Sequence, residues 1–380
     1  MAWRYRFPQV GTFAAVAELR RFLGHDPAWD FPALAAQWSR LEPLQVSRYR
    51  NARGMITYHP WYDGFRAEAA NRCLAETAEL GAGYIRLDVR WKDLLPDGHN
   101  VDEAAWSWYR NYLVAARNWY GLEPLIVLFN PPDVVRNYAV KERLATWTQY
   151  VDDVAKRSQS LCSLFQLLNE PNNPVYRVFS LREVSEAIVS GAEAIKRYNA
   201  QAKVTINVLA GLPGWERDLE VLVGTSGSSI DIIGLDYYPG TWTLSPLSDG
   251  ANWDLFAERM TDICGALRNR PIAILETGYS TNVPLQRGEK QQVRYLRRLQ
   301  DAIKRWDERM ALTSPVLLGI HELSDADTGV FLDPEAHFGL LKSGSLRRKA
   351  GFEAARALFQ SLEPKIADKA GAPVRSAFPQ

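Results

Sequence analysis

Two glutamates follow directly on largely apolar segments of the sequence. Residues 164–168 lead into Asn169-Glu170-Pro171, and residues 272–275 form a second run that ends on Glu276. A carboxyl group at the end of a buried strand is costly unless it has a partner or a task. Two such groups on one scaffold can serve as the acid and the nucleophile that break a glycosidic bond. Glu170 and Glu276 are therefore the candidate catalytic pair.

The scaffold that must present this pair alternates strand-like and helix-like segments. Eight short runs rich in Ile, Val and Leu are typical of parallel strands buried on both faces. They cover residues 54–58, 84–89, 125–129, 164–168, 204–209, 230–235, 272–275 and 316–320. Amphipathic stretches of helical length lie between them, and one opens with the capping box Ser180–Glu183. Eight such units predict an α/β fold, a (β/α)8 TIM barrel, rather than an open sheet.

The barrel is expected to occupy residues 52–362. Residues 1–51 contain two helix-like pieces and predict a short helical N-terminal extension packed on the barrel, whereas residues 363–380 predict a loose tail. Those helix-like pieces cover residues 13–23 and 31–41. Active residues of such barrels come from the C-terminal ends of the strands. Glu170 and Glu276 follow the fourth and seventh predicted strands, so both belong at that end.

This combination resembles clan A of the glycoside hydrolases, the retaining (β/α)8 enzymes with catalytic glutamates on strands four and seven. Residues 167–171 are similar to the acid/base signature of that clan, and residues 275–280 to its nucleophile strand. The resemblance covers about residues 52–360 and leans toward families 39 and 5, without matching either cleanly. It implies that Glu170 is the acid/base and Glu276 the nucleophile. The implied reaction cleaves a β-linked oligo- or polysaccharide through a covalent glycosyl-enzyme intermediate.

The second and sixth strands resemble the clan at residues that would lie beside the nucleophile. Residues 84–88 contain Arg86, and residues 233–239 contain Tyr238, with Tyr237 as the alternative if the register differs by one. An arginine and a tyrosine hydroxyl beside Glu276 would favour its carboxylate form. Glu170, facing that negative charge, would have a raised pKa and remain protonated as the acid.

Four further polar residues at strand ends are expected to bind substrate. Asn169 is placed to hydrogen-bond the sugar 2-hydroxyl, an interaction that strengthens in the transition state. His59, Asp236 and His321 end or follow the first, sixth and eighth strands. The eighth strand of this clan often ends in a tryptophan under the cleaved sugar, but residues 318–323 contain none. The sugar class therefore stays open.

The sequence has 13 tryptophans, several of them in predicted strand-to-helix loops where rings can stack on sugars. Trp91 and Trp242 are taken as substrate-binding candidates among the four loop tryptophans, the others being Trp61 and Trp215. The competing interpretation for each is packing in the core.

Composition narrows the class of partner. The 45 basic and 44 acidic residues nearly balance, which argues against a nucleic-acid partner, and no apolar run has the length of a membrane span. Three scattered cysteines and five histidines without metal-ligand spacing predict no metal and no cofactor. The first residues lack an apolar signal segment, so the sequence as it stands predicts a cytoplasmic protein, or a secreted or periplasmic one if a signal has been removed. The oligomeric state stays open.

The favoured interpretation is a retaining β-glycosidase with a carbohydrate substrate. Two alternatives remain. A transglycosylase would use the same two glutamates but pass the covalent intermediate to a sugar hydroxyl. A non-catalytic carbohydrate-binding barrel would keep the fold without turnover.

Overall fold

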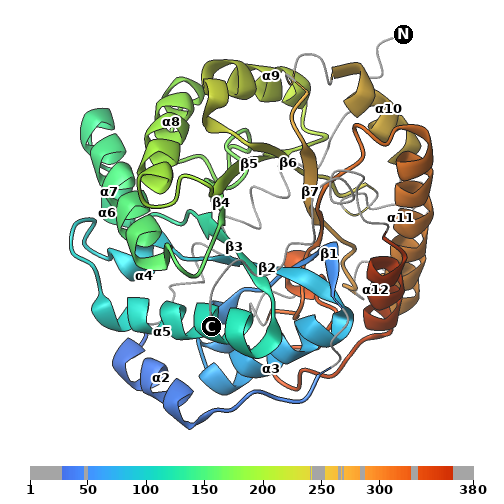
Figure 1. The fold of residues 1–380 in the computed structure, drawn as a ribbon, viewed down its shortest axis with the longest axis horizontal. Helices are drawn as coiled ribbons and strands as arrows, with labels where there is room; N and C mark the ends of the chain where they lie inside the picture. Colours follow the sequence, from blue (N-terminus) through green and yellow to red (C-terminus); the bar gives the residue numbers. More distant parts are fainter. Residues whose placement is uncertain are drawn as a thin grey trace.

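The protein folds into a closed barrel of eight parallel strands surrounded by helices, as the computed structural model shows (Figure 1). The structure describes residues 28–46, 50–239, 241, 253–263, 267, 269–282, 287–326 and 333–362. Each strand pairs with the next in sequence, and β8 pairs with β1 to close the barrel. The strands are β1 (Asn51–Thr57), β2 (Ala82–Asp88), β3 (Glu123–Leu128), β4 (Leu164–Leu167), β5 (Lys203–Leu209), β6 (Ile232–Asp236), β7 (Ile272–Thr277) and β8 (Leu318–Ile320). The predicted (β/α)8 fold is confirmed.

Helices follow the strands and cover the outside of the barrel (Figure 1). The longer ones are α3 (Ala67–Leu80), α5 (Glu103–Val114), α7 (Val140–Ser158), α8 (Leu181–Tyr198), α9 (Trp215–Thr225), α10 (Trp253–Ile263), α11 (Glu289–Arg309) and α12 (Ala350–Ser361). Short helical segments are α4 (Trp91–Leu94), α6 (Asp133–Arg136), η2 (Pro60–Asp63), η3 (Ala115–Trp119), η4 (Gly227–Ser229) and η7 (Glu335–His337). The predicted capping box is present at the start of α8, where Ser180 and Glu183 bond each other's backbone N–H. Among the described helices, none is both long and apolar enough to cross a bilayer.

Strand residues alternate between two apolar clusters. In β3, Leu125 and Val127 belong to a small cluster with Met55 and Leu275, whereas Ile126 belongs to the large cluster that includes the helices. Because successive strand residues point to opposite faces, the small cluster fills the barrel interior and the large one joins the strands to the helix layer. This packing on both faces explains why the strands were recognisable as continuous apolar runs.

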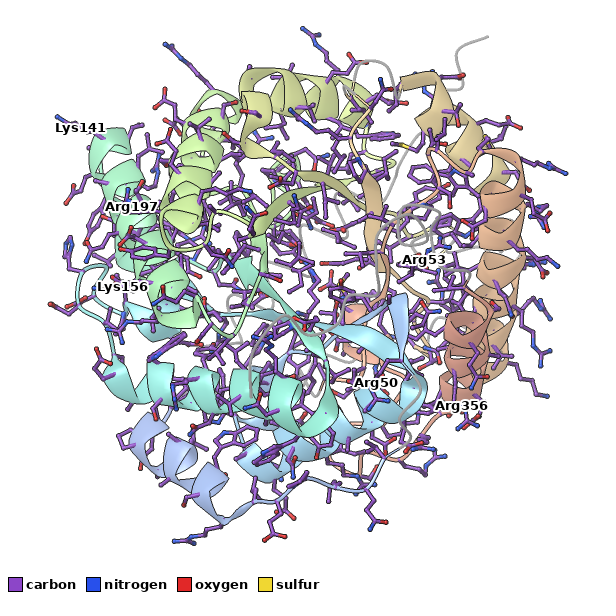
Figure 2. The ribbon with its side chains drawn as sticks, in the orientation of Figure 1. Arg50, Arg53, Lys141, Lys156, Arg197 and Arg356 are labelled. Atoms are coloured by element: carbon purple, nitrogen blue, oxygen red, sulfur yellow. The ribbon has the colours of Figure 1, made fainter. Side chains whose placement is uncertain are left out.

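An ion pair between a buried arginine and a partly exposed aspartate ties the barrel to its helix layer. Arg53 of β1 donates two hydrogen bonds to Asp307 of α11, at 2.8 and 3.1 Å. Figure 2 shows Arg53 inside the ring of helices, whereas the labelled Lys141 and Arg197 lie at its periphery. A charge buried at Arg53 is tolerated because its partner and the Pro315 carbonyl satisfy it.

The segment before β1 packs on the side of the barrel. It contains α2 (Phe31–Gln37) and η1 (Trp38–Arg40), within the stretch predicted as helical. Phe31 contacts the Phe65 ring at a centroid distance of 5.1 Å, and Trp38 contacts Trp108 of α5 at 5.9 Å. The other predicted N-terminal helix, residues 13–23, and the tail at 363–380 lie outside the described residues.

Candidate active site

A cavity of about 190 Å³ opens at the C-terminal ends of the strands. Both glutamates of the candidate pair line it, together with five of the other predicted site residues: Asn169, Arg86, Tyr238, His59 and His321. The remaining wall is made by Trp61, Tyr62, Asp88, Phe129, Asn130, Tyr176, Leu209, Glu335 and Phe338. Eight strands converge at this end, so residues far apart in sequence share one space.

Glu276, within β7, is held by two donors, Arg86 of β2 and Tyr238, which follows β6. The Arg86 Nη2 atom lies 2.7 Å from Glu276 Oε1, and the Tyr238 hydroxyl donates to Oε2 at 2.5 Å. Burial alone would raise the pKa of Glu276. The Arg86 charge, followed by His321 and the Tyr238 hydrogen bond, outweighs this effect of burial, and the pKa of Glu276 is lowered to about 2. Glu276 is therefore a carboxylate at neutral pH.

Glu170 follows β4 in a left-handed backbone conformation. Leu168 and Glu170 have φ of 63° and 42°, which turns the chain sharply after the strand. The Glu170 N–H donates to Asn207 Oδ1 at 2.8 Å, and Asn173 Nδ2 donates to Glu170 Oε2 at 2.7 Å. Burial, followed by the negative charge of Glu276, raises the pKa of Glu170 to about 8. Glu170 thus keeps its proton at neutral pH.

The two glutamates are close enough to act on one bond. One carboxyl oxygen of each, with one of Asp236, forms a set whose members all lie within 4.8 Å of one another. Three buried carboxyls so close could in principle share a cation. Each oxygen of Glu276 already has a donor, however. Arg86 compensates the charge of the carboxylate, and Tyr238 donates a hydrogen bond to it. The arrangement suits proton transfer and nucleophilic attack within one small space.

Asn169 joins three strands at a single atom. Its Oδ1 accepts hydrogen bonds from Arg86 Nη2 at 3.1 Å, from Gln166 Nε2 at 3.2 Å and from Asn207 Nδ2 at 2.8 Å. These three donors fix which side of the amide is the oxygen. The NH2 group is left on the opposite side as the donor that Asn169, a residue of the cavity wall, can offer to a ligand.

A polar cluster lies near the ends of β1 and β8, where residues 318–323 contain no tryptophan. His59 Nδ1 lies 2.8 Å from Glu322 Oε2, and His321 Nε2 lies 3.5 Å from the same atom. Burial lowers the pKa of His321 and lowers that of His59 to about 4. Both rings are therefore neutral near pH 7. His59 and His321 thus contribute two imidazole rings to the cavity wall, and Trp61 lies next to His59 at a centroid distance of 4.5 Å.

Two predicted substrate-binding residues, Trp91 and Asp236, are not among the residues that line this cavity. Trp91 is 1% exposed, stacks on Tyr150 at 5.2 Å and does not line the cavity, because it opens α4 and points into the helix layer. Asp236 is also absent from the cavity wall; it is fully buried and accepts a hydrogen bond from Asn207. Trp242 lies outside the described residues.

The register after β6 favours Tyr238 over Tyr237. The Tyr237 ring stacks on Phe256 of α10 at a centroid distance of 4.0 Å, so it faces the helices. Trp215 likewise packs against Phe256, at 6.0 Å. Adjacent strand residues face opposite sides, and only one tyrosine of the pair can reach the nucleophile.

Several residues that build the site were not predicted. Asn207 of β5, Asn173 and Gln166 supply hydrogen bonds to Glu170 and Asn169, and Glu322 lies within 3.5 Å of both histidines. Asn207 and Gln166 are polar residues inside apolar strands, which is a signal that the sequence does carry. Asn173 and Glu322 lie in loops, where polarity is ordinary and carries no such signal.

Comparisons with known proteins show a shared fold. No family model and no curated protein sequence matches this chain. A β-glycosidase crystal structure is 18% identical with a TM-score of 0.61, and the match covers 82% of this chain and 88% of that one. The GH5_18 protein of Streptomyces cattleya in complex with GlcNAc is 14% identical, with a TM-score of 0.65 and coverage of 83% and 82%.

A family 39 glycoside hydrolase from Bacteroides cellulosilyticus is 17% identical with a TM-score of 0.58. The match covers 83% of this chain and 64% of that protein, so this chain spans less than two thirds of its length. The predicted likeness to clan A, with families 39 and 5 among its neighbours, is thereby confirmed for the fold. Because one fold hosts many functions, the fold alone does not assign a function to this cavity.

Proposed function

We propose that the protein is a retaining β-glycosidase in which Glu276 is the nucleophile and Glu170 the acid/base. The observation that carries the proposal is the approach of their carboxyl oxygens to within 4.8 Å. Retaining enzymes hold their carboxyl groups about 5–5.5 Å apart, whereas inverting enzymes leave about 6.5–9.5 Å for a water molecule. The spacing here supports direct attack on the sugar.

The first step would form a glycosyl ester. Glu276 attacks the anomeric carbon, and the bond from that carbon to the glycosidic oxygen breaks. Glu170 gives its proton to the departing oxygen, which leaves as an alcohol. The opposite pKa shifts of the two residues support these roles, because one must be ionised and the other protonated at the same pH.

The second step would return both residues to their starting states. Formation of the ester removes the negative charge of Glu276, so the pKa of Glu170 falls and its carboxylate can act as a base. Glu170 then takes a proton from water, and the resulting oxygen attacks the anomeric carbon. The ester bond breaks, Glu276 regains its charge, and the sugar keeps its original anomeric configuration.

Other cavity residues would position the sugar. The Asn169 NH2 group supports a hydrogen bond to the 2-hydroxyl beside the reacting carbon. Arg86 and Tyr238 would hold Glu276 at the angle needed for attack and receive its charge again when the ester is cleaved.

The charge distribution favours an uncharged sugar. Among the described residues of the cavity wall, Arg86 is the one permanent cation, and it is already bound to Glu276, Gln166 and Asn169. The histidines are neutral near pH 7. Since Asp88 and Glu335 also line this cavity, an anionic sugar would meet carboxyl groups without a free counter-charge.

The experiment measures reducing ends released from a panel of β-linked glycans and aryl β-glycosides, with neutral and uronic sugars in each set. Release by the wild type that is lost in Glu276→Gln would support the proposal, and the preferred glycan would identify the sugar. Glu186→Gln, an exposed change on α8, serves as the matched control. Binding of glycans without release would favour the carbohydrate-binding alternative. Equal release by the wild type and Glu276→Gln would exclude Glu276 as nucleophile.

A further inference from the structure

A third carboxyl group lies beside the candidate pair without entering the cavity. Asp236 is the last residue of β6 and is fully buried. One of its oxygens belongs to the set that lies within 4.8 Å of oxygens of Glu170 and Glu276. The proposed reaction gives this residue no task, although a buried acid next to two others is costly.

The hydrogen bonds around Asp236 are incomplete. Its Oδ2 accepts from Asn207 Nδ2, but no described group donates to its buried Oδ1. Asn207 is already committed, since its Oδ1 receives the Glu170 N–H and its Nδ2 also bonds Asn169. An ionised Asp236 would therefore leave Oδ1 without a donor, although Asp236 belongs to a set of carboxyl groups with oxygens that lie within 4.8 Å of one another. A proton on that oxygen would convert the repulsion into a hydrogen bond.

The charged groups around Asp236 come from four other positions in the barrel end. Glu276 of β7 and Glu170 after β4 are acidic, Arg86 of β2 is cationic, and the Tyr238 hydroxyl is directed at Glu276. Burial, then Glu276 and Glu170, raise the pKa of Asp236 well above its usual range, against the opposing effect of Arg86. Arg86 pairs directly with Glu276, so the negative charge of Glu276 offsets much of the favourable effect that the Arg86 charge would have on an ionised Asp236.

We propose that Asp236 is a positioning residue that keeps its proton through the catalytic cycle and donates it as a hydrogen bond to the Glu170 carboxyl. This inference rests on the proposed glycosidase function for its catalytic consequence. A hydrogen bond from Asp236 lowers the pKa of Glu170, opposing the effects of burial and of Glu276. The Asp236 proton thus stabilises the Glu170 carboxylate after it has protonated the leaving group. No proton leaves Asp236 in either step.

Replacement of Asp236 by asparagine and by alanine distinguishes a protonated Asp236 from an ionised one. In Asp236→Asn, the amide oxygen can accept from Asn207 and the NH2 group can donate to Glu170, as in the protonated acid. The alkaline limb of the pH profile of kcat/KM, which reports Glu170 in the free enzyme, should then shift by less than about 0.5 pH unit. Asp236→Ala removes the donor, so that limb should move up by about one pH unit, with kcat reduced about tenfold to a hundredfold.

The opposite result would overturn the proposal. If Asp236 were ionised, both substitutions would remove a negative charge beside Glu170, and both would move the alkaline limb down by about one pH unit or more. A purely structural role would lower activity and the melting temperature of both variants without moving the limb. Thermal unfolding of each variant, followed by circular dichroism, identifies any loss caused by misfolding.

A spectroscopic measurement tests the proton without any substrate. The infrared difference between wild type and Asp236→Asn at pH 7, with 13C-labelled aspartate, should contain the C=O band of a protonated carboxyl that is lost in the variant. A carboxylate band in its place would overturn the proposal, as would a band that changes on adding Mg²⁺ or Ca²⁺, because a bound cation would then replace the proton. If no glycan is cleaved but the acid band is present, the proposed function fails while the proton on Asp236 stands.

Discussion

The ends of β4 and β7 carry the same side chain in opposite surroundings. Glu276 faces a guanidinium and a tyrosine hydroxyl, one for each of its oxygens. Glu170 receives an amide N–H from Asn173, and the negative charges of Glu276 and Glu335 raise its pKa. Both residues are at most 6% exposed, so burial alone does not distinguish them. The different protonation states of Glu170 and Glu276 must therefore come from their neighbouring groups.

This contrast shows how one fold assigns two chemical roles to one residue type. A buried carboxylate beside Arg86 is stable as an anion and can attack an electron-poor carbon. A buried carboxyl beside that anion is stable only when it is neutral, and can donate a proton. Exchanging the neighbours should therefore exchange or abolish the roles. Four substitutions test the dependence of each role on its surroundings, in order of decreasing expected effect.

Glu276→Ala should abolish turnover, with kcat reduced by about 10⁴-fold or more, because the carboxylate proposed to form the glycosyl ester is then missing. Azide, as a small external nucleophile, should restore turnover of an activated aryl glycoside and give a glycosyl azide of inverted configuration. The anomeric configuration is read by proton NMR. A rescued product of retained configuration would contradict the assigned role of Glu276.

Glu170→Ala should slow cleavage in a manner that depends on the leaving group. Sugars with poor leaving groups need the proton of Glu170, so kcat/KM for them should fall about 10²- to 10⁴-fold. Aryl glycosides with acidic leaving groups should be affected far less in the first step. The dependence of kcat/KM on leaving-group pKa should become steep in the variant, and an unchanged slope would exclude Glu170 as the acid.

Tyr238→Phe should weaken the hold on Glu276. Loss of this hydrogen bond raises the pKa of Glu276, and the acidic limb of kcat/KM should move up by about one pH unit, with activity reduced about tenfold to a hundredfold. Tyr237→Phe is the matched control, since that ring stacks on Phe256. If both substitutions shifted the limb equally, the register after β6 would be contradicted.

Glu170→Gln should make stability less dependent on pH. The pKa of Glu170 is raised in the folded state to about 8, so the stability it contributes is present below its unfolded pKa and is lost as the pH rises through 8. The glutamine variant should therefore be more stable than wild type at pH 9 by roughly 1–3 kcal/mol, with little difference at pH 4. Urea unfolding at both pH values provides the measurement. An equal difference at the two pH values would contradict it.

The barrel could be predicted from sequence because its signal is local. Each strand is buried on both faces, so it appears as an apolar run, and the predicted strands begin and end within a few residues of the observed ones. Glu170 and Glu276 were recognisable for a related reason, since a carboxyl at the end of such a run stands out. Strand order then brings these ends together without further information from the sequence.

The sequence could not show in this way which of the other candidate residues line the cavity. Trp61 and Trp91 both follow strands in short connecting segments, yet one lines the cavity and the other stacks on Tyr150 of α7. That difference is decided by the packing of a helix that lies more than 50 residues further along the chain. The position of Asp236 outside the cavity wall could not be predicted for the same reason, because it depends on how its neighbours Glu170 and Asn207 are placed.

The left-handed backbone at Glu170 has a consequence for laboratory evolution. A residue with a side chain in this conformation typically costs about 1 kcal/mol or more, and here the same residue also keeps an acid buried. Glycine at position 170 would relieve both costs. A library selected only for resistance to heat should therefore drift toward small neutral residues at this position while losing turnover. Such a drift would mark the reaction centre with no glycan in the assay.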